Sequence, residues 1–290
     1  MTVYLNGKFM PIEEATIPVL DRGFIFGDGV YEVIPVYSQR AFRLAAHLHR
    51  LQASLDGIRL PNPHSEIEWS KLINELIARN SAEDQYLYLH ITRGVAKRDH
   101  AFPQPAVSPT VFMMSSPLLH PAAELLQTGV SAVTAIDNRW LRCDIKAISL
   151  LPNVLLRQQA VDAGCAEAIL IRTEKDDTDS FMTEGAASNI FVVKNGTLLA
   201  PSKDNLMLPG ITYDVILEIA RAHNIPTQVR KILKPEIFSA DELLLTSSTR
   251  EVMPITTLDG KPVGNGHPGP LFAQLHTLYQ NFKREVMRQP

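Results

Sequence analysis

Apolar and polar residues follow two periods along this chain, one typical of helices and one typical of strands. Apolar positions three and four residues apart predict helices over Arg43–Leu60, Ser65–Arg79, Pro152–Ala163, the segment from Gly210 to Ala222, and Phe272–Met287. Runs rich in β-branched and aromatic residues predict strands over Tyr86–Thr92, Val111–Met114, Gly129–Ile136, Ala166–Arg172, Ile190–Lys194 and Glu242–Leu245. Asn6-Gly7 between two short apolar runs predicts a hairpin over Val3–Phe9 with a type I′ turn.

A break in this pattern separates the chain into two parts. The segment Ser115–Pro121 contains two serines and two prolines and interrupts the periodic elements on either side. We therefore expect a smaller domain over residues 1–118, a linker over 119–125 and a larger domain over 126–290.

Composition narrows the choice of partners. The 290 residues are 45% hydrophobic and 20% charged, with a formal net charge of −3 and no basic run, so nucleic acid and anionic membrane surfaces are not expected partners. No apolar run approaches the roughly 20 residues of a membrane-spanning helix, and the first residues lack an apolar signal core. The two cysteines, Cys143 and Cys165, have no metal-ligand spacing, and we expect a reduced, cytoplasmic setting.

The first candidate for chemistry is Lys146, which lies in the run Ile145–Leu151 among apolar neighbours. One interpretation is a lysine whose stem packs on the core while its amine reaches water. The other is a partly desolvated amine with a lowered pKa, able to form a Schiff base with an aldehyde cofactor such as pyridoxal phosphate. That cofactor also requires a phosphate cradle, a carboxylate for its pyridine nitrogen and a site for the substrate.

Candidates for these other parts occur elsewhere in the chain. Glu184 lies among small and apolar residues, where an unpaired carboxylate is costly and a cationic partner would relieve the cost. Gly210 precedes a helix, whose first N–H groups suit a phosphate, although it is also an ordinary helix start. The hydroxyl run Thr246–Thr249 is a second cradle candidate or a plain polar turn. Arg98 and His100 suit a carboxylate better than a metal, and we expect no metal site.

Taken in order, these segments resemble the fold-type IV pyridoxal-phosphate enzymes, the class IV aminotransferases, and the resemblance covers nearly the whole chain. The matching segments are Phe26–Glu32, His47-x-x-Arg50-Leu51, Asp144–Lys146, Thr183–Gly185, Gly210–Thr212 and Ser247–Thr249. The resemblance implies an α+β or α/β fold of two domains, a smaller N-terminal α/β domain and a larger C-terminal domain with a barrel-like sheet and helices. Within the family, Arg98-Asp99-His100 and Arg139–Lys146 resemble the subfamily that acts on D-amino acids.

The resemblance also implies roles for individual residues. Lys146 would carry pyridoxal 5′-phosphate and move the substrate proton, and Glu184 would keep the pyridine nitrogen protonated. The implied cofactor-binding residues are Arg50, Lys146, Glu184, Ser188, Leu208, Ile211, Thr212, Ser248 and Thr249. Tyr31, Arg98 and His100 would bind the substrate carboxylate, with Arg98 and His100 acting in the neighbouring subunit of a homodimer. One departure is Ala186-Ala187-Ser188, where relatives of this kind carry more serines.

The expected reaction is a ping-pong transfer of the amino group of a D-amino acid, such as D-alanine, to a 2-oxo acid, such as 2-oxoglutarate. The alternatives within the same fold are a branched-chain L-amino-acid aminotransferase, a 4-amino-4-deoxychorismate lyase and an (R)-amine transaminase. Arg98 together with His100 speaks against all three. A non-catalytic pyridoxal-phosphate carrier is the alternative from another class, and an intact Lys146 and Glu184 speak against it.

Overall fold

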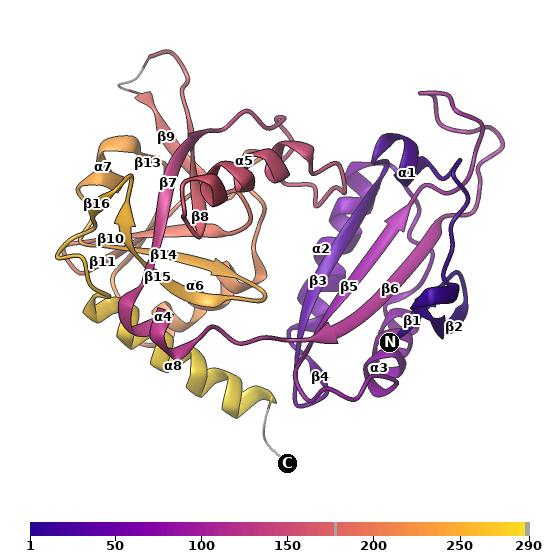
Figure 1. The fold of residues 1–290 in the computed structure, drawn as a ribbon, viewed down its shortest axis with the longest axis horizontal. Coiled ribbons are helices and arrows are strands. Elements are labelled where there is room, and N and C mark those ends of the chain that lie inside the picture. The colour runs from indigo at the N-terminus through magenta and orange to yellow at the C-terminus, as the bar shows by residue number, and fades with distance from the viewer. Residues whose placement is uncertain (177–178, 288–290) are drawn as a thin grey trace. The chain divides into compact units, whose positions relative to one another are not determined.

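The chain forms two compact units, each drawn in Figure 1. The structure, a computed structural model, describes residues 1–176 and 179–287. The first unit contains Met1–Leu119 together with Ile145–Leu150, and the second contains His120–Asp144 and the described residues from Leu151 onward. Residues Ile145–Leu150 were expected in the larger C-terminal domain, whereas their contacts belong to the first unit. Helix α4 (Ala123–Thr128) also begins inside the segment 119–125, which was expected to be a linker.

The first unit is built on a six-stranded antiparallel sheet in the order β2-β1-β6-β5-β3-β4. Its elements are β1 (Thr2–Leu5), β2 (Lys8–Pro11), a 3₁₀ turn (Ile12–Glu14), α1 (Arg22–Phe26), β3 (Gly29–Tyr37), β4 (Arg40–Ala41), α2 (Leu44–Gly57), α3 (Glu66–Ala78), β5 (Gln85–Thr92) and β6 (Thr110–Pro117). Helices α2 and α3 share one apolar core with the sheet, in which Leu51 and Ile73 pack with Leu87. One face of the central strands β3, β5 and β6 is therefore buried.

Two local predictions in this unit, the hairpin over Val3–Phe9 and the helix over Ser65–Arg79, are confirmed. Strands β1 and β2 form the expected hairpin, and Asn6 and Gly7 both have positive φ, 48° and 91°, as a type I′ turn requires. Helix α3 begins with a capping box, in which Ser65 Oγ accepts from the backbone N–H of Glu68 and the Glu68 carboxylate accepts from the N–H of Ser65. The turn and the helix start are thus fixed by residues that are close together in the chain.

The second unit is built on a curled ten-stranded sheet with helices packed against it. The strand order is β12-β11-β10-β14-β15-β7-β8-β9-β13, with β16 added beside β15. Its remaining elements are β7 (Val130–Ile136), α5 (Leu151–Asp162), β8 (Glu167–Arg172), β9 (Phe181–Gly185), β10 (Asn189–Lys194), β11 (Thr197–Ala200), α6 (Ile211–Ala222), β12 (Thr227–Val229), β13 (Ile232–Leu233), α7 (Lys234–Phe238), β14 (Glu242–Ser247), β15 (Glu251–Leu258), β16 (Lys261–Pro262) and α8 (Pro270–Met287). The mixed fold expected from the sequence is confirmed.

Strand β8 shows why its sequence is a nearly continuous apolar run. Ile169 and Ile171 face the central core of the curled sheet, whereas Ala168 and Leu170 pack in a separate cluster with Leu156 of α5. A strand that is buried on both faces needs apolar residues at every position. In the part of the chain that is described, no helix combines the length and the apolar character that crossing a membrane requires.

Candidate active site

Lys146 lies in an extended segment that runs beside β3 in the first unit. Its carbonyl accepts from the N–H of Tyr31 at 3.0 Å, its own N–H donates to Ser54 Oγ at 3.1 Å, and Ala147 bridges to Val30. Ile145 and Ala147 are buried in the apolar core of the unit, whereas the half-buried Lys146 has its Nζ 4.2 Å from the centroid of the Tyr31 ring. The side chains on either side of Lys146 are therefore apolar because they pack in the core. The amine of Lys146 lies over the Tyr31 ring instead.

Arg50 belongs to a buried cluster with Glu32 and His47 in the same unit. Arg50 donates to Glu32 through Nε at 2.7 Å and through Nη2 at 2.8 Å, and His47 Nδ1 lies 2.8 Å from the same carboxylate. Although burial opposes it, this pairing holds the pKa of Glu32 well below its usual range. Because an ionised carboxylate only accepts, His47 donates through Nδ1, and its buried Nε2 has no hydrogen-bond partner among the described residues.

Arg98 and His100 lie together on the loop that follows β5. Both side chains are exposed, and both rest on Phe26 of α1. The guanidinium carbon of Arg98 is 5.4 Å from the Phe26 ring centroid, and the His100 ring centroid is 5.3 Å from it. The structure thus brings Arg98 and His100 around one aromatic ring and brings Tyr31 together with Lys146.

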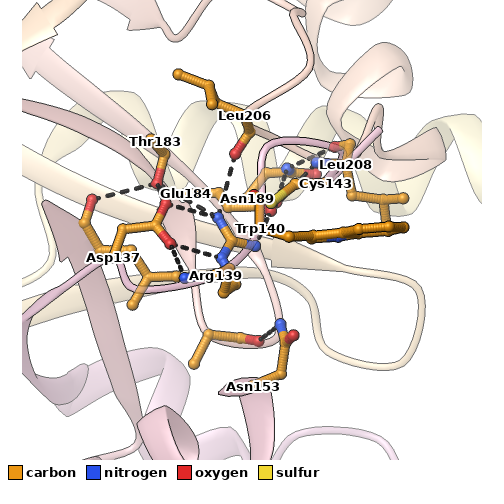
Figure 2. A network of polar contacts seen from close by, with 12 residues as sticks. Asp137, Arg139, Trp140, Cys143, Asn153, Thr183, Glu184, Asn189, Leu206 and Leu208 are labelled. Carbon is orange, nitrogen blue, oxygen red and sulfur yellow. Dashed lines mark hydrogen bonds and ion pairs between the residues drawn. The ribbon is translucent and has the colours of Figure 1, made fainter. Parts of the chain in front are cut away.

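Glu184 lies on β9 at the centre of a buried polar network in the second unit, shown in Figure 2. Its Oε1 accepts from Arg139 Nη1 at 2.5 Å and from the backbone N–H of Leu208 at 3.1 Å. Its Oε2 accepts from Asn189 Nδ2 at 3.0 Å. Arg139 also binds Asp137, through Nε at 2.9 Å and Nη2 at 3.0 Å, so that one guanidinium serves two carboxylates.

The pKa values of the two carboxylates in this network shift in opposite directions. Burial raises the pKa of Glu184 to about 7, and the Arg139 contact opposes this rise without overcoming it. Burial also acts on Asp137, but its bonds to Arg139 and to the Thr183 hydroxyl hold its pKa below the usual range. Burial raises the pKa of the adjacent Cys143 thiol to about 11, which keeps that thiol protonated at neutral pH. Glu184 is therefore the acid in this network whose charge is incompletely compensated.

The remaining predicted site residues of the second unit lie on three segments. Leu208 contacts Glu184 through its backbone N–H, and its carbonyl accepts from Asn189 at 3.0 Å. Ser188 donates from Oγ to the buried Glu167 at 2.8 Å, so its hydroxyl belongs to a different carboxylate from Glu184. Ser248 and Thr249 are half-buried in the turn between β14 and β15.

Ile211 and Thr212 form the first turn of α6, next to Asn189. The residue before the helix, Gly210, provides no capping side chain, so the first N–H groups of the helix are available to an anion. A Cβ at Gly210 would overlap Asn189 Oδ1, which explains a glycine at this position. The close approach fixes the helix N-terminus beside the residue that donates to Glu184.

This donor set fits a phosphorylated, cationic heterocycle. In the second unit, the α6 N-terminus has uncapped N–H groups for a phosphate. The carboxylate of Glu184 accepts three hydrogen bonds and has about four lone-pair sites, which leaves room for one further donor. Across residues 1–176 and 179–287, no group of His, Cys, Asp or Glu side chains has an arrangement that could hold a metal ion.

No role was predicted from the sequence for Asp137, Arg139 or Asn189, nor for Glu32 and His47. A signal existed for Glu32, because it occupies the inward side of the alternation Val30, Glu32, Ile34 and so had to be buried with a partner. Asp137 and Arg139 follow directly after β7, where polar residues at a strand end often serve a site. The bond between Arg139 and Glu184 could not be read from local sequence.

Comparisons with known proteins agree on one family. Residues 29–258 match the family model described as amino-transferase class IV. The chain is 40% identical over 281 residues to D-alanine aminotransferase from Bacillus licheniformis, covering 97% of this chain and 96% of that protein. It is 38% identical over 294 residues to D-alanine aminotransferase from Listeria monocytogenes, covering 99% and 97%.

Solved structures of branched-chain amino acid aminotransferases share the same fold. The enzyme from Escherichia coli superposes with a TM-score of 0.88 at 26% identity, covering 97% of this chain and 93% of that chain. The T.th. enzyme, solved with pyridoxamine 5′-phosphate, gives a TM-score of 0.89 at 26% identity, covering 100% and 95%.

Proposed function

Because the chain belongs to the amino-transferase class IV family, we propose that it is a pyridoxal-phosphate-dependent transaminase of D-amino acids. The donor would be a D-amino acid such as D-alanine, and the acceptor a 2-oxo acid such as 2-oxoglutarate. The near-full-length identity to D-alanine aminotransferases from two bacteria supports the choice of donor. The identity to the branched-chain enzymes is much lower, although their fold is the same.

One observation carries the proposal: Lys146 has its backbone hydrogen-bonded on both sides and its amine over the Tyr31 ring. Pyridoxal phosphate, when bound, supplies an aldehyde that condenses with amines and a ring that draws electrons from the substrate Cα. Lys146 Nζ would hold the cofactor covalently and then move the proton of the substrate Cα. The fixed backbone restricts the positions that this amine can reach.

The other residues would bind and orient the cofactor or the substrate. Glu184 would hold the proton of the pyridine nitrogen, which its buried and undercompensated carboxylate suits. Arg50, Ser248, Thr249 and the N–H groups of Ile211 and Thr212 would hold the phosphate, and Leu208 would pack on the ring. Ser188, whose hydroxyl donates to Glu167, would also bind the cofactor. Tyr31, Arg98 and His100 would bind the substrate carboxylate.

Reduction with borohydride tests the role of Lys146. The cofactor should become covalently attached to the peptide that contains Lys146, as read by mass spectrometry of the digested protein. The Lys146→Ala protein should remain unlabelled at that peptide and should lose transaminase activity. Labelling of Lys146→Ala protein at the wild-type rate would remove Lys146 from the proposed role.

Comparison of D- and L-amino acids as donors tests which enantiomer the protein accepts. Fixing the carboxylate decides which enantiomer directs its Cα–H at Lys146, and each charge-assisted bond is worth about 1.5–3 kcal/mol. Loss of two such bonds would lower kcat/KM by roughly 10²–10⁴-fold for the wrong enantiomer. The protein should convert D-alanine and 2-oxoglutarate to pyruvate and D-glutamate. If L-leucine is the better donor by tenfold, the branched-chain alternative replaces this proposal.

We also propose a homodimer in the cytoplasm, with Arg98 and His100 acting in the partner's site. Their exposure supports this, because carboxylate-binding side chains on an outward loop can reach a second subunit. Mixing Lys146→Ala and Arg98→Ala proteins under subunit exchange should restore activity, since one site in each mixed dimer would be intact. Failure of recovery after proven exchange would assign Arg98 to its own subunit.

A further inference from the structure

Arg22 in the first turn of α1 is buried, 4% exposed, and belongs to none of the roles assigned above. Asp21 caps this short helix by accepting from the N–H of Gly23 at 2.8 Å. Arg22 Nε donates to Asp28 at 2.7 Å, just beyond the helix. Asp28 in turn accepts two bonds from Arg93 at the end of β5, at 2.8 and 3.0 Å. One end of the Arg22 guanidinium is therefore fixed by a carboxylate that is itself fixed to the sheet.

The other end of the guanidinium reaches a loop nearly 80 residues away. Arg22 Nη1 donates to the carbonyl of Asp99 at 2.6 Å and to that of Ala101 at 3.2 Å, and Nη2 donates to that of His100 at 3.4 Å. Three consecutive carbonyls thus accept from one buried cation. These carbonyls belong to the loop whose side chains include Arg98 and His100.

Phe26, one turn further along α1, supports the same loop from its side-chain face. Its ring centroid lies 4.9 Å from the guanidinium carbon of Arg22, 5.4 Å from that of Arg98 and 5.3 Å from the His100 ring. Residues four apart on a helix share one face, so Arg22 and Phe26 act on the loop together. The loop backbone is held while the Arg98 and His100 side chains remain exposed.

We propose that Arg22, held by Asp28, is a positioning residue that fixes the loop so that Arg98 and His100 meet a substrate carboxylate in one geometry. This inference rests on the proposed function of those two residues. A loop that is already ordered avoids the entropy loss of ordering on binding, and this preserves affinity for the carboxylate. The role needs the fork of an arginine, because the single ammonium of a lysine cannot reach both Asp28 and three carbonyls.

Arg22→Lys, which keeps the charge and removes the fork, is the decisive variant. We expect KM for D-alanine and for 2-oxoglutarate to rise about 10- to 100-fold, with kcat changed by less than about threefold and pyridoxal-phosphate affinity unchanged. Arg59→Lys is the matched control, because Arg59 contacts the same loop through the Phe102 ring but donates to none of the three carbonyls. An unchanged KM in Arg22→Lys, or a fall confined to kcat, would overturn the proposal.

A double variant separates positioning from general damage. In an Arg98→Ala background, Arg22→Lys should raise KM by about threefold or less, because only His100 is left for the loop to position. Full additivity of the two changes would overturn the proposal. If Arg22→Lys does not fold, Phe26→Leu replaces it: this change removes the ring under Arg98 and His100 and should raise KM about two- to fivefold. No change in KM for folded Phe26→Leu protein would count against the proposal.

Hydrogen exchange without substrate distinguishes failure of this inference from failure of the proposed function. The Ala101 amide, which donates to Asp99 Oδ1 at 3.0 Å, should exchange at least about tenfold faster in Arg22→Lys than in wild type, while the amides of β5 should not change. If the wild-type protein lacks transaminase activity, faster loop exchange in Arg22→Lys together with weaker binding of propionate by that variant would still support the positioning role of Arg22. Unchanged loop exchange in Arg22→Lys would overturn the positioning role of Arg22, whether or not the protein has transaminase activity.

Discussion

Glu32 and Glu184 are both buried carboxylates that bind an arginine, yet their pKa values move in opposite directions. Burial favours the protonated acid at both positions. At Glu32, Arg50 directs two nitrogens to the one carboxylate and His47 adds a third contact, and the pKa falls below its usual range. At Glu184, burial prevails and the pKa rises to about 7.

The difference lies in how the arginine is shared. Arg139 directs two nitrogens to Asp137 and one to Glu184, and the negative charge of Asp137 further disfavours ionisation of Glu184. The Glu32 cluster is therefore saturated, which suits a residue that only orients Arg50. The Glu184 network remains one cation short, which suits a residue that would face a protonated pyridine nitrogen. A buried ion pair alone does not distinguish these two situations.

Removal of each arginine should give the largest contrast. Arg50→Met leaves the ionised Glu32 buried with His47 alone and should lower the free energy of unfolding by about 3–5 kcal/mol. Arg139→Met should cost less, about 1–3 kcal/mol, because Glu184 can take up a proton near pH 7 and Asp137 keeps Arg172 at 3.2 Å. Urea denaturation of the cofactor-free proteins at pH 7 measures both. Equal costs would contradict the assignment of different charge states.

Neutralising each carboxylate should separate catalysis from cofactor binding. Glu184→Gln should retain pyridoxal phosphate and slow turnover by about 10²-fold or more, a typical effect of removing one preorganised charge, which corresponds to about 2.7 kcal/mol. Glu32→Gln should raise the Kd for pyridoxal phosphate about tenfold, because Arg50 loses its bidentate anchor, and should leave kcat at saturating cofactor nearly unchanged. Unchanged kcat in Glu184→Gln would remove Glu184 from the mechanism.

The pH dependence of stability should give the smallest of the three effects. A carboxyl whose folded pKa lies near 7 keeps its proton where the unfolded chain has lost it, so its contribution to stability falls as pH rises from about 4.5 to 7. For Glu184 this fall is about 1 kcal/mol between pH 5.5 and 6.5. Subtracting the Glu184→Gln profile from that of cofactor-free wild type isolates it. A difference that is flat or rises with pH would show that Glu184 is ionised throughout.

The sequence by itself determined the features that depend on near neighbours. Helix α3 begins directly after Ser65 because Ser65 and Glu68 cap its first turn, and the Asn6-Gly7 turn depends on two residues that tolerate positive φ. The period of apolar residues placed helices and strands because burial of one face requires it. Family motifs at Lys146 and Glu184 are likewise short segments whose residues are adjacent in the chain.

Only the tertiary structure decided which charges meet. Glu184 binds Arg139 from 45 positions away, Ser188 binds Glu167, and the guanidinium of Arg22 reaches the loop of residues 99–101 across almost 80 positions. The segment Ile145–Leu150 packs with the first unit although it follows the start of the second. Such pairings depend on the order in which strands join a sheet, and that order is set by the packing of whole elements. A charged residue is therefore recognisable in the sequence as one that needs a partner, but its partner is chosen by the fold.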